Sequence, residues 1–152
     1  MIKGLGVILA SLVAVSNALA DGATPSDPEI VAAGRQIYGD YCASCHGEAG
    51  EGTENWQKPD ENGNLLPPPH NAQGHTWRHP DGVLYQMILK GWRDPFNGTP
   101  DLTMPPFEGV LEPDEIHAVL TYIKTLWTAD QRALQAEESA ARPFPDAAQP
   151  SP

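Results

Sequence analysis

Apolar residues recur at helical spacing in three stretches of the chain, and long polar segments separate these stretches. The first stretch follows Asp27-Pro28-Glu29, where Asp27 is suited to cap a helix and Pro28 to occupy its first position. The pattern predicts a helix that runs from there into residues 42–46 and ends at Gly47. Its apolar stripe consists of Ile30, Ala33, Gly34, Ile37, Tyr38 and Tyr41.

Two more amphipathic helices are predicted further along. One begins near His79-Pro80-Asp81, ends at Gly91 and has an apolar face made of Val83, Leu84, Met87 and Ile88. The last core helix opens at Pro113, and its apolar stripe consists of Ile116, Val119, Leu120, Ile123 and Trp127. Thr128 and Gln131 form a candidate capping box for a short extra helix over 129–140.

The segments between these helices, residues 47–79 and 92–112, are polar and rich in Gly and Pro. Neither shows a strand pattern, so the sequence predicts an all-α fold with three or more helices and long loops. Residues 28–128 form the predicted domain. In residues 129–152 we expect the short helix and then a disordered tail, because 141–152 is rich in Pro and Ala.

The first 20 residues resemble an export signal. Lys3 supplies the positive start, an apolar run covers residues 5–15, and Ala18-Leu19-Ala20 fits a cleavage site. Cleavage would leave 21–27 as a short leader and place the protein in the periplasm or outside the cell. The alternative is an uncleaved segment that anchors the protein to a membrane. Elsewhere the sequence contains no stretch that is apolar enough to span a bilayer.

The chain is acidic, with 20 Asp and Glu against nine Lys and Arg and a net charge of −11. Loss of Lys3 with residues 1–20 would make the charge −12. Such a surface argues against nucleic acid or an anionic membrane as a partner. It favours a protein partner with a basic docking patch, although the charge also serves solubility.

Only two cysteines are present, in Cys42-Ala43-Ser44-Cys45-His46, the attachment motif for a c-type haem. On a helix, positions i and i+3 share a face, so both thiols can form thioethers to one porphyrin and the adjacent His46 can bind the iron. A redox-active CxxC would need a βαβ context, and a zinc site would need further ligands. We therefore predict one covalent haem c.

A second axial ligand is predicted at Met104. The residue lies in the proline-bounded loop 102–107, whose stiff backbone can present a thioether without an ordering cost. Met87 lies on the apolar face of a predicted helix and is interpreted as core filler. His70, His75 and His79 remain alternative ligands, and a copper site at His75 and His79 is a more remote possibility.

The chain resembles the class I monohaem cytochromes c over residues 28–128. It is similar to short bacterial members related to the haem subunits of cbb3-type oxidases. The matching motifs are Ala33-Gly34-Arg35-Gln36-Ile37-Tyr38, Cys42–Gly47, Met104-Pro105-Pro106-Phe107 and Leu120-Thr121-Tyr122-Ile123-Lys124. The resemblance implies that the first and last helices cross at Gly34, with Tyr38 and Tyr122 beside the crossing. It also implies that a carbonyl of Pro67, Pro68 or Pro69 accepts the His46 N–H.

Residues 74–79 depart from the minimal family pattern because they are richer in His and Trp. Trp77 and Arg78 are candidate donors to the haem propionates, and Trp92 is a third. A haem with His46 and Met104 as ligands has no open position for a substrate and suits one-electron transfer. The expected function is therefore that of an electron carrier and not of an enzyme. The alternatives are a five-coordinate haem sensor and a haem subunit docked to a larger dehydrogenase or oxidase.

Overall fold

The computed structural model describes residues 27–93 and 102–148. Five α-helices follow one another there: α1 (Pro28–Tyr41), α2 (Ala43–His46), α3 (Asp81–Lys90), α4 (Pro113–Thr125) and α5 (Ala129–Ala141). Two short 3-10 helices, η1 (Thr76–Arg78) and η2 (Asp146–Ala148), complete the list. This part of the chain contains no strand, and its one isolated bridge joins Trp92 to Met104. The predicted all-α fold is confirmed.

The helices begin where their sequences predict. The Asp27 side chain accepts a hydrogen bond from the Glu29 N–H at 2.8 Å, and a proline occupies the first position of both α1 and α4. Thr128 and Gln131 form the predicted capping box of α5, with bonds of 3.0 and 3.2 Å between side chain and backbone. One detail differs: Cys42 breaks the first predicted helix, because its backbone turns and α2 starts after it.

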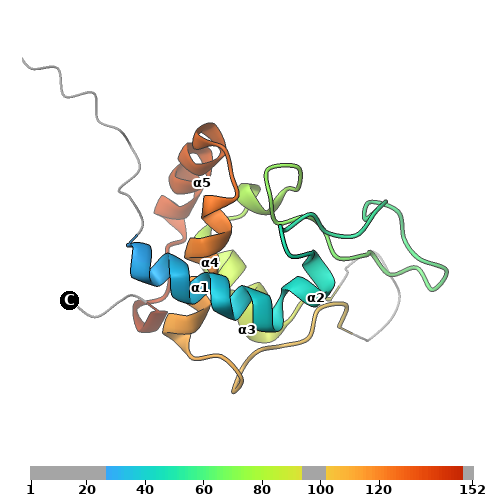
Figure 1. Ribbon diagram of the computed structural model, residues 1–152, viewed down its shortest axis with the longest axis horizontal. Helices are drawn as coiled ribbons and strands as arrows, with labels where there is room; N and C mark the ends of the chain where they lie inside the picture. The colour runs from blue at the N-terminus through green and yellow to red at the C-terminus, as the bar shows by residue number, and fades with distance from the viewer. Residues whose placement is uncertain (1–26, 94–101, 149–152) are drawn as a thin grey trace, which may run out of the picture.

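Helices α1 and α4 cross at the centre of the molecule (Figure 1). The crossing depends on Gly34, because a Cβ there would overlap the carbonyl oxygen of Ala118 and lie 3.0 Å from the Tyr122 Cβ. Tyr38 is 1% exposed, and its ring lies 5.3 Å from the Tyr122 ring between centroids. Its hydroxyl donates to the Gly47 carbonyl at 3.0 Å. The close crossing and its tyrosine pair are as the resemblance implied.

The C-terminal region packs against this core rather than extending from it. Helix α5 contacts η1 and α3, and η2 contacts α4. Phe144 lies edge-on to His117 with 4.6 Å between ring centroids, and Ala148 is fully buried. The expectation of disorder is therefore wrong for residues 142–148, because a few well-spaced apolar anchors suffice to dock a proline-rich segment. Residues 149–152 lie outside the described ranges, as do the predicted signal peptide and nearly all of the leader.

Candidate functional site

A cavity of about 310 Å³ lies between α2, α3, α4 and the two long loops. Cys45 and His46 of α2 line this cavity, and Met104 lines it from the loop before α4. Cys42 is buried in the adjoining core. The structure therefore brings the predicted attachment motif and the predicted second ligand together, although 57 residues separate His46 from Met104 in the sequence.

The cavity is large enough for a cofactor, and its walls divide into two chemical types. One part is apolar and suits a porphyrin ring: Leu65, Leu66, Leu84, Met87, Ile88, Leu120 and Ile123. The other part is polar and aromatic: Trp56, His70, His75, Thr76 and His79. A haem, with its apolar ring, soft iron and two carboxylates, fits this combination of lining residues.

His46 is held at one of its two ring nitrogens. Its Nδ1 donates to the Pro68 carbonyl at 2.9 Å, which selects one of the three prolines that the sequence left open. This bond fixes the ring and leaves Nε2 as the nitrogen for an iron. The side chain is 7% exposed, and burial lowers its pKa, while the bond to Pro68 acts in the opposite direction. A neutral imidazole with a fixed tautomer is the form that a metal requires.

The two cysteines form no disulfide with each other, and Cys42 is buried whereas Cys45 is exposed. Burial, with a smaller effect of Cys45, raises the pKa of Cys42 to about 11. A thiol–disulfide exchange enzyme lowers the pKa of its nucleophilic cysteine instead. The environment of Cys42 therefore disfavours the CxxC oxidoreductase alternative.

The loop that carries Met104 is fastened to the end of α3. Met104 and Trp92 exchange two backbone hydrogen bonds, of 3.0 and 3.1 Å. Gly91 makes this approach possible, because its φ is +74° and a Cβ would lie 2.6 Å from the Met104 carbonyl oxygen. Phe107 adds a bond from its N–H to the Ile88 carbonyl at 3.1 Å. In the sequence, this loop was marked by its prolines and by the motif Met104-Pro105-Pro106-Phe107.

Met87 also lines the cavity, in addition to packing against the core as predicted. Two thioethers thus face the same space, and only one of them lies in a loop shaped by Pro105 and Pro106.

The His70 ring stacks face to face on the His46 ring, with 3.8 Å between centroids and an interplanar angle of 18°. His70 is therefore packed against the residue that would hold the iron, whereas Met104 reaches the cavity from a separate loop.

The structure does not bring Trp77 and Arg78 to the cavity. The Trp77 indole N–H already donates to the Gly74 carbonyl at 3.0 Å, and the Arg78 guanidinium stacks over the Trp77 ring at 4.9 Å. Their neighbours His75 and His79 line the cavity, as does Trp92. With three residues per turn, successive side chains around this 3-10 helix point in different directions, and the composition of the loop could not reveal which of them face the cavity.

Two of the lining histidines, His70 and His75, have a buried Nδ1 without a hydrogen-bond partner, and only the His70 ring is stacked on His46. The His75 ring stacks on Trp56 at 5.2 Å, and burial lowers its pKa. His79 lies edge-on to it, with 5.4 Å between centroids. In the described residues no group of three or more His, Cys, Asp or Glu side chains is placed to hold a metal ion. That finding gives no support to a copper site at His75 and His79.

The geometry describes a small helical protein with one cavity that is lined by both an anchored imidazole and a thioether. Residues 31–127 match the cytochrome c family model, and the chain belongs to that family. It is a class I cytochrome c, with covalently attached haem c as its cofactor and electron transfer as its function.

Three relatives illustrate the similarity. The chain is 32% identical over 96 residues to the quinohemoprotein alcohol dehydrogenase ADH IIB of Pseudomonas putida. The aligned residues make up 63% of this chain and 11% of that protein. It is 46% identical over 37 residues to the cbb3-type cytochrome c oxidase subunit FixPc of Rhizobium leguminosarum bv. viciae, which covers 24% of this chain and 13% of the subunit.

The third relative is a solved structure. The crystal structure of cytochrome cL from the marine methylotroph Methylophaga aminisulfidivorans superposes with a TM-score of 0.52 at 24% identity. The match covers 77% of this chain and 67% of that one. This likeness supports the fold. The chain itself spans only a small part of the two curated relatives, at 11% and 13% of their lengths.

Proposed function

We propose that this protein is a periplasmic electron carrier whose single haem c is attached through Cys42 and Cys45 and ligated by His46 and Met104. The observation that carries the proposal is the shared cavity, in which an imidazole anchored to Pro68 faces the same space as a thioether fastened to Trp92. When bound, the haem iron supplies a reversible one-electron couple. The chain's own residues fix the ligands and exclude water from the site.

The periplasmic location in this proposal rests on the N-terminal segment. Residues 1–20 have the composition of a signal peptide, and residues 21–27 then form the leader of the mature chain. Among the described residues, no helix is long and apolar enough to cross a membrane. N-terminal sequencing of the exported protein tests the proposal. A new terminus at Asp21 supports it, and a retained Lys3 would instead favour a membrane anchor.

The attachment is tested by substituting the two thiols. Cys42→Ser with Cys45→Ser should yield protein whose haem is extracted by acidified acetone, because no thioether can form. Ser44→Ala is the matched control, since it changes an exposed residue between the two cysteines and should leave the haem covalent. Covalent haem that survives the double substitution would overturn the assignment.

The second ligand is tested by comparing the two methionines of the cavity. A thioether favours ferrous iron, so Met104→Ala should lower the reduction potential by at least about 59 mV, a tenfold change for a one-electron couple. It should also open a position for cyanide and remove the charge-transfer band of ferric iron–thioether ligation. Met87→Leu should change none of these and should cost less than about 1.5 kcal/mol. The reverse pattern would make Met87 the ligand. A wild-type spectrum in both variants would point to a histidine.

We further propose that His75, not Trp77 or Arg78, donates to a haem propionate. The support is its buried, unpartnered Nδ1 in the cavity that holds the ligands; the other such nitrogen, His70 Nδ1, belongs to a ring that is stacked on His46. Buried carboxylates require such donors. His75→Phe should shift the pH at which a propionate titrates, followed through the pH dependence of the potential. Trp77→Phe should leave that pH unchanged.

The partner of this carrier is proposed to present a basic patch, because the chain is strongly acidic. The bimolecular rate of electron transfer should fall as ionic strength rises from about 0.1 to 1 M, over which the Debye length shrinks from about 10 to 3 Å. A rate that stays flat would limit the role of the acidic surface to solubility.

A permanently docked subunit is the second candidate function. The observation in its favour is that a dehydrogenase and an oxidase subunit are among the similar proteins. Helix α5 gives it no additional support, because the helix packs against its own domain. Co-purification with a dehydrogenase or oxidase from membranes of the source organism separates the two candidates.

A further inference from the structure

One line of side chains near the C-terminus contacts a segment that lies far away in the sequence. Trp127, Gln131, Gln135 and Ser139 follow one another at intervals of four residues, which places Gln131, Gln135 and Ser139 on one face of α5. Each of the four contacts residues 70–81, which comprise the loop that leads into α3 and the first residue of α3. We call these four residues the α5 clamp.

The first half of the clamp binds carbonyls at the start of the loop. The Trp127 indole N–H donates to the His70 carbonyl at 2.8 Å, and the Gln131 amide donates to the Ala72 carbonyl at 2.9 Å. The amide oxygen of Gln131 simultaneously accepts the Thr128 N–H at 3.0 Å. Gln131 therefore caps its own helix and holds the loop with the same side chain.

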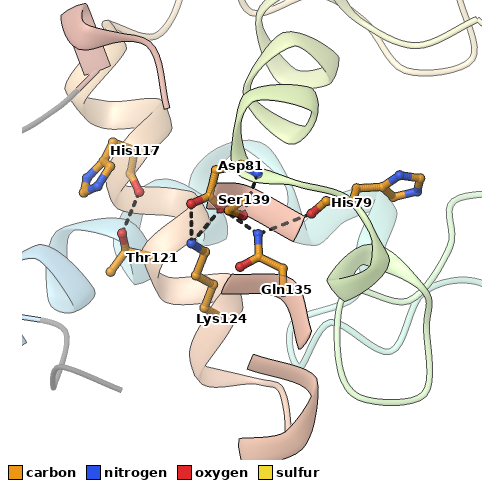
Figure 2. Close-up of polar contacts among 7 residues, drawn as sticks. All are labelled: His79, Asp81, His117, Thr121, Lys124, Gln135 and Ser139. Carbon is orange, nitrogen blue, oxygen red and sulfur yellow. Dashed lines mark hydrogen bonds and ion pairs between the residues drawn. The ribbon is translucent and has the colours of Figure 1, made fainter. Parts of the chain in front are cut away.

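The second half binds the other end of the loop. Gln135 is 1% exposed and donates to the His79 carbonyl at 3.2 Å and to the Asp81 carboxylate at 2.6 Å. Ser139 accepts the Asp81 N–H at 3.0 Å. Lys124 of α4 pairs with the same carboxylate at 2.6 Å (Figure 2). Asp81 thus joins α3 to Lys124 of α4 and to Gln135 and Ser139 of α5 where the loop ends.

The segment held in this way has little regular structure of its own. It contains only the three residues of η1, yet it contributes His70, His75, Thr76 and His79 to the cavity. Hydrogen bonds within it are short-range turns, such as that from the Gly74 N–H to the Asn71 carbonyl at 3.0 Å. A loop of this kind keeps one conformation only if other elements supply partners for its carbonyls.

We infer that the α5 clamp positions the histidine-bearing wall of the haem cavity, and that Gln131 and Gln135 are positioning residues for the environment of the haem. The C-terminal helix is then a working part of the redox site and not a docking extension. This inference rests on the proposed function only in taking the cavity as the haem site.

The test uses the exported holoprotein and two clamp variants. Gln131→Glu keeps an acceptor for the Thr128 N–H but removes the donor to Ala72, and Gln135→Leu removes both bonds of the buried amide. Ala133→Glu is the control for the added charge, and Leu134→Ala is the control for a changed side chain, because both residues are exposed on α5. The two measurements are amide hydrogen exchange and the reduction potential.

In both clamp variants, the Gly74, Arg78 and His79 amides should exchange at least tenfold faster than in the wild type. The amides of α1 should keep their wild-type rates, and the potential should shift. The controls should change neither quantity. Wild-type exchange in the clamp variants would overturn the inference. Faster exchange at an unchanged potential would also overturn it, because the clamp would then be merely structural.

If Gln135→Leu does not fold, Gln131→Glu decides alone, since it changes a residue that is only partly buried. The failure of the proposed function has a separate signature, namely a wild-type protein without covalent haem. Extraction of the wild type with acidified acetone reveals that failure before any clamp variant is compared, so the two failures are distinguishable.

Discussion

The crossing of α1 and α4 and the loop 70–81 are held together in opposite ways. The crossing is formed by apolar stripes whose spacing is visible in the sequence, and its side chains are among the most deeply buried in the described residues: Tyr38, Ile116, Val119, Leu120 and Ile123. The loop has no such stripe and is held by polar side chains that reach its carbonyls from 56 to 59 residues away. Packing defines the first region, and satisfied hydrogen bonds define the second.

Substitutions in the two regions should therefore affect different properties, namely the stability of the fold and the environment of the haem site. Apolar burial supplies most of the free energy of folding, so damage to the crossing should unfold the protein. A net hydrogen bond contributes only about 0.5–1.5 kcal/mol, so damage to the loop should leave a folded protein with an altered site. Substitutions in the two regions can therefore be ranked before any measurement.

The largest effect is expected at the crossing itself. Gly34→Ala should destabilise the holoprotein by about 3 kcal/mol, because the added methyl group meets a backbone carbonyl that cannot move aside. Gly39→Ala makes the same change in the same helix at a position where nothing lies within 4 Å of the new Cβ. It should stabilise by about 0.5–1 kcal/mol, the usual gain when a helical glycine is replaced. Urea unfolding of both variants measures the contrast, and equal effects would refute the close crossing.

The same contrast explains which features the sequence could predict. Helix periodicity and capping residues located the starts of α1, α3, α4 and α5, and the CxxCH spacing located one wall of the cavity. These signals are local, and each involves residues within a few positions of one another.

The other features depended on contacts between distant residues. Nothing local distinguishes Pro68 from its two neighbours, or His75 from Trp77, because the choice lies in the direction of a loop held by α5. Trp56, Leu65 and Leu66 were missed as cavity residues for the same reason. The docking of residues 142–148 was also hidden, since Phe144 and Ala148 form no periodic pattern.

An intermediate effect is expected at the ion pair where the two regions meet. The side chains of Asp81 and Lys124 are 11% and 22% exposed. Those of the surface pair Lys90 and Glu108 are 54% and 60% exposed. Asp81→Asn leaves a largely buried ammonium without its partner and should cost about 2 kcal/mol, between the values for surface and buried pairs. Glu108→Gln should change stability by less than about 1 kcal/mol. Thermal unfolding of the two variants measures the difference, and similar costs would show that the Asp81 pair is well solvated.

The smallest effect is expected at His117, where α4 meets the C-terminal segment. Burial, which is the main cause, and the charge of Lys124 lower its pKa, while Asp81 and Asp114 act in the opposite direction. Because the folded state then binds fewer protons than the unfolded state, this histidine lowers stability as the pH falls through about 6.5 toward its folded pKa. The ring is only partly buried, so His117→Gln should recover no more than about 0.5 kcal/mol at acid pH and nothing at neutral pH. Phe144→Ala should uncover the ring and return its pKa toward the ordinary value, as an NMR titration of the imidazole would show. An unchanged titration curve would mean that Phe144 does not cover His117 in solution, and that residues 142–148 are held to α4 by other contacts.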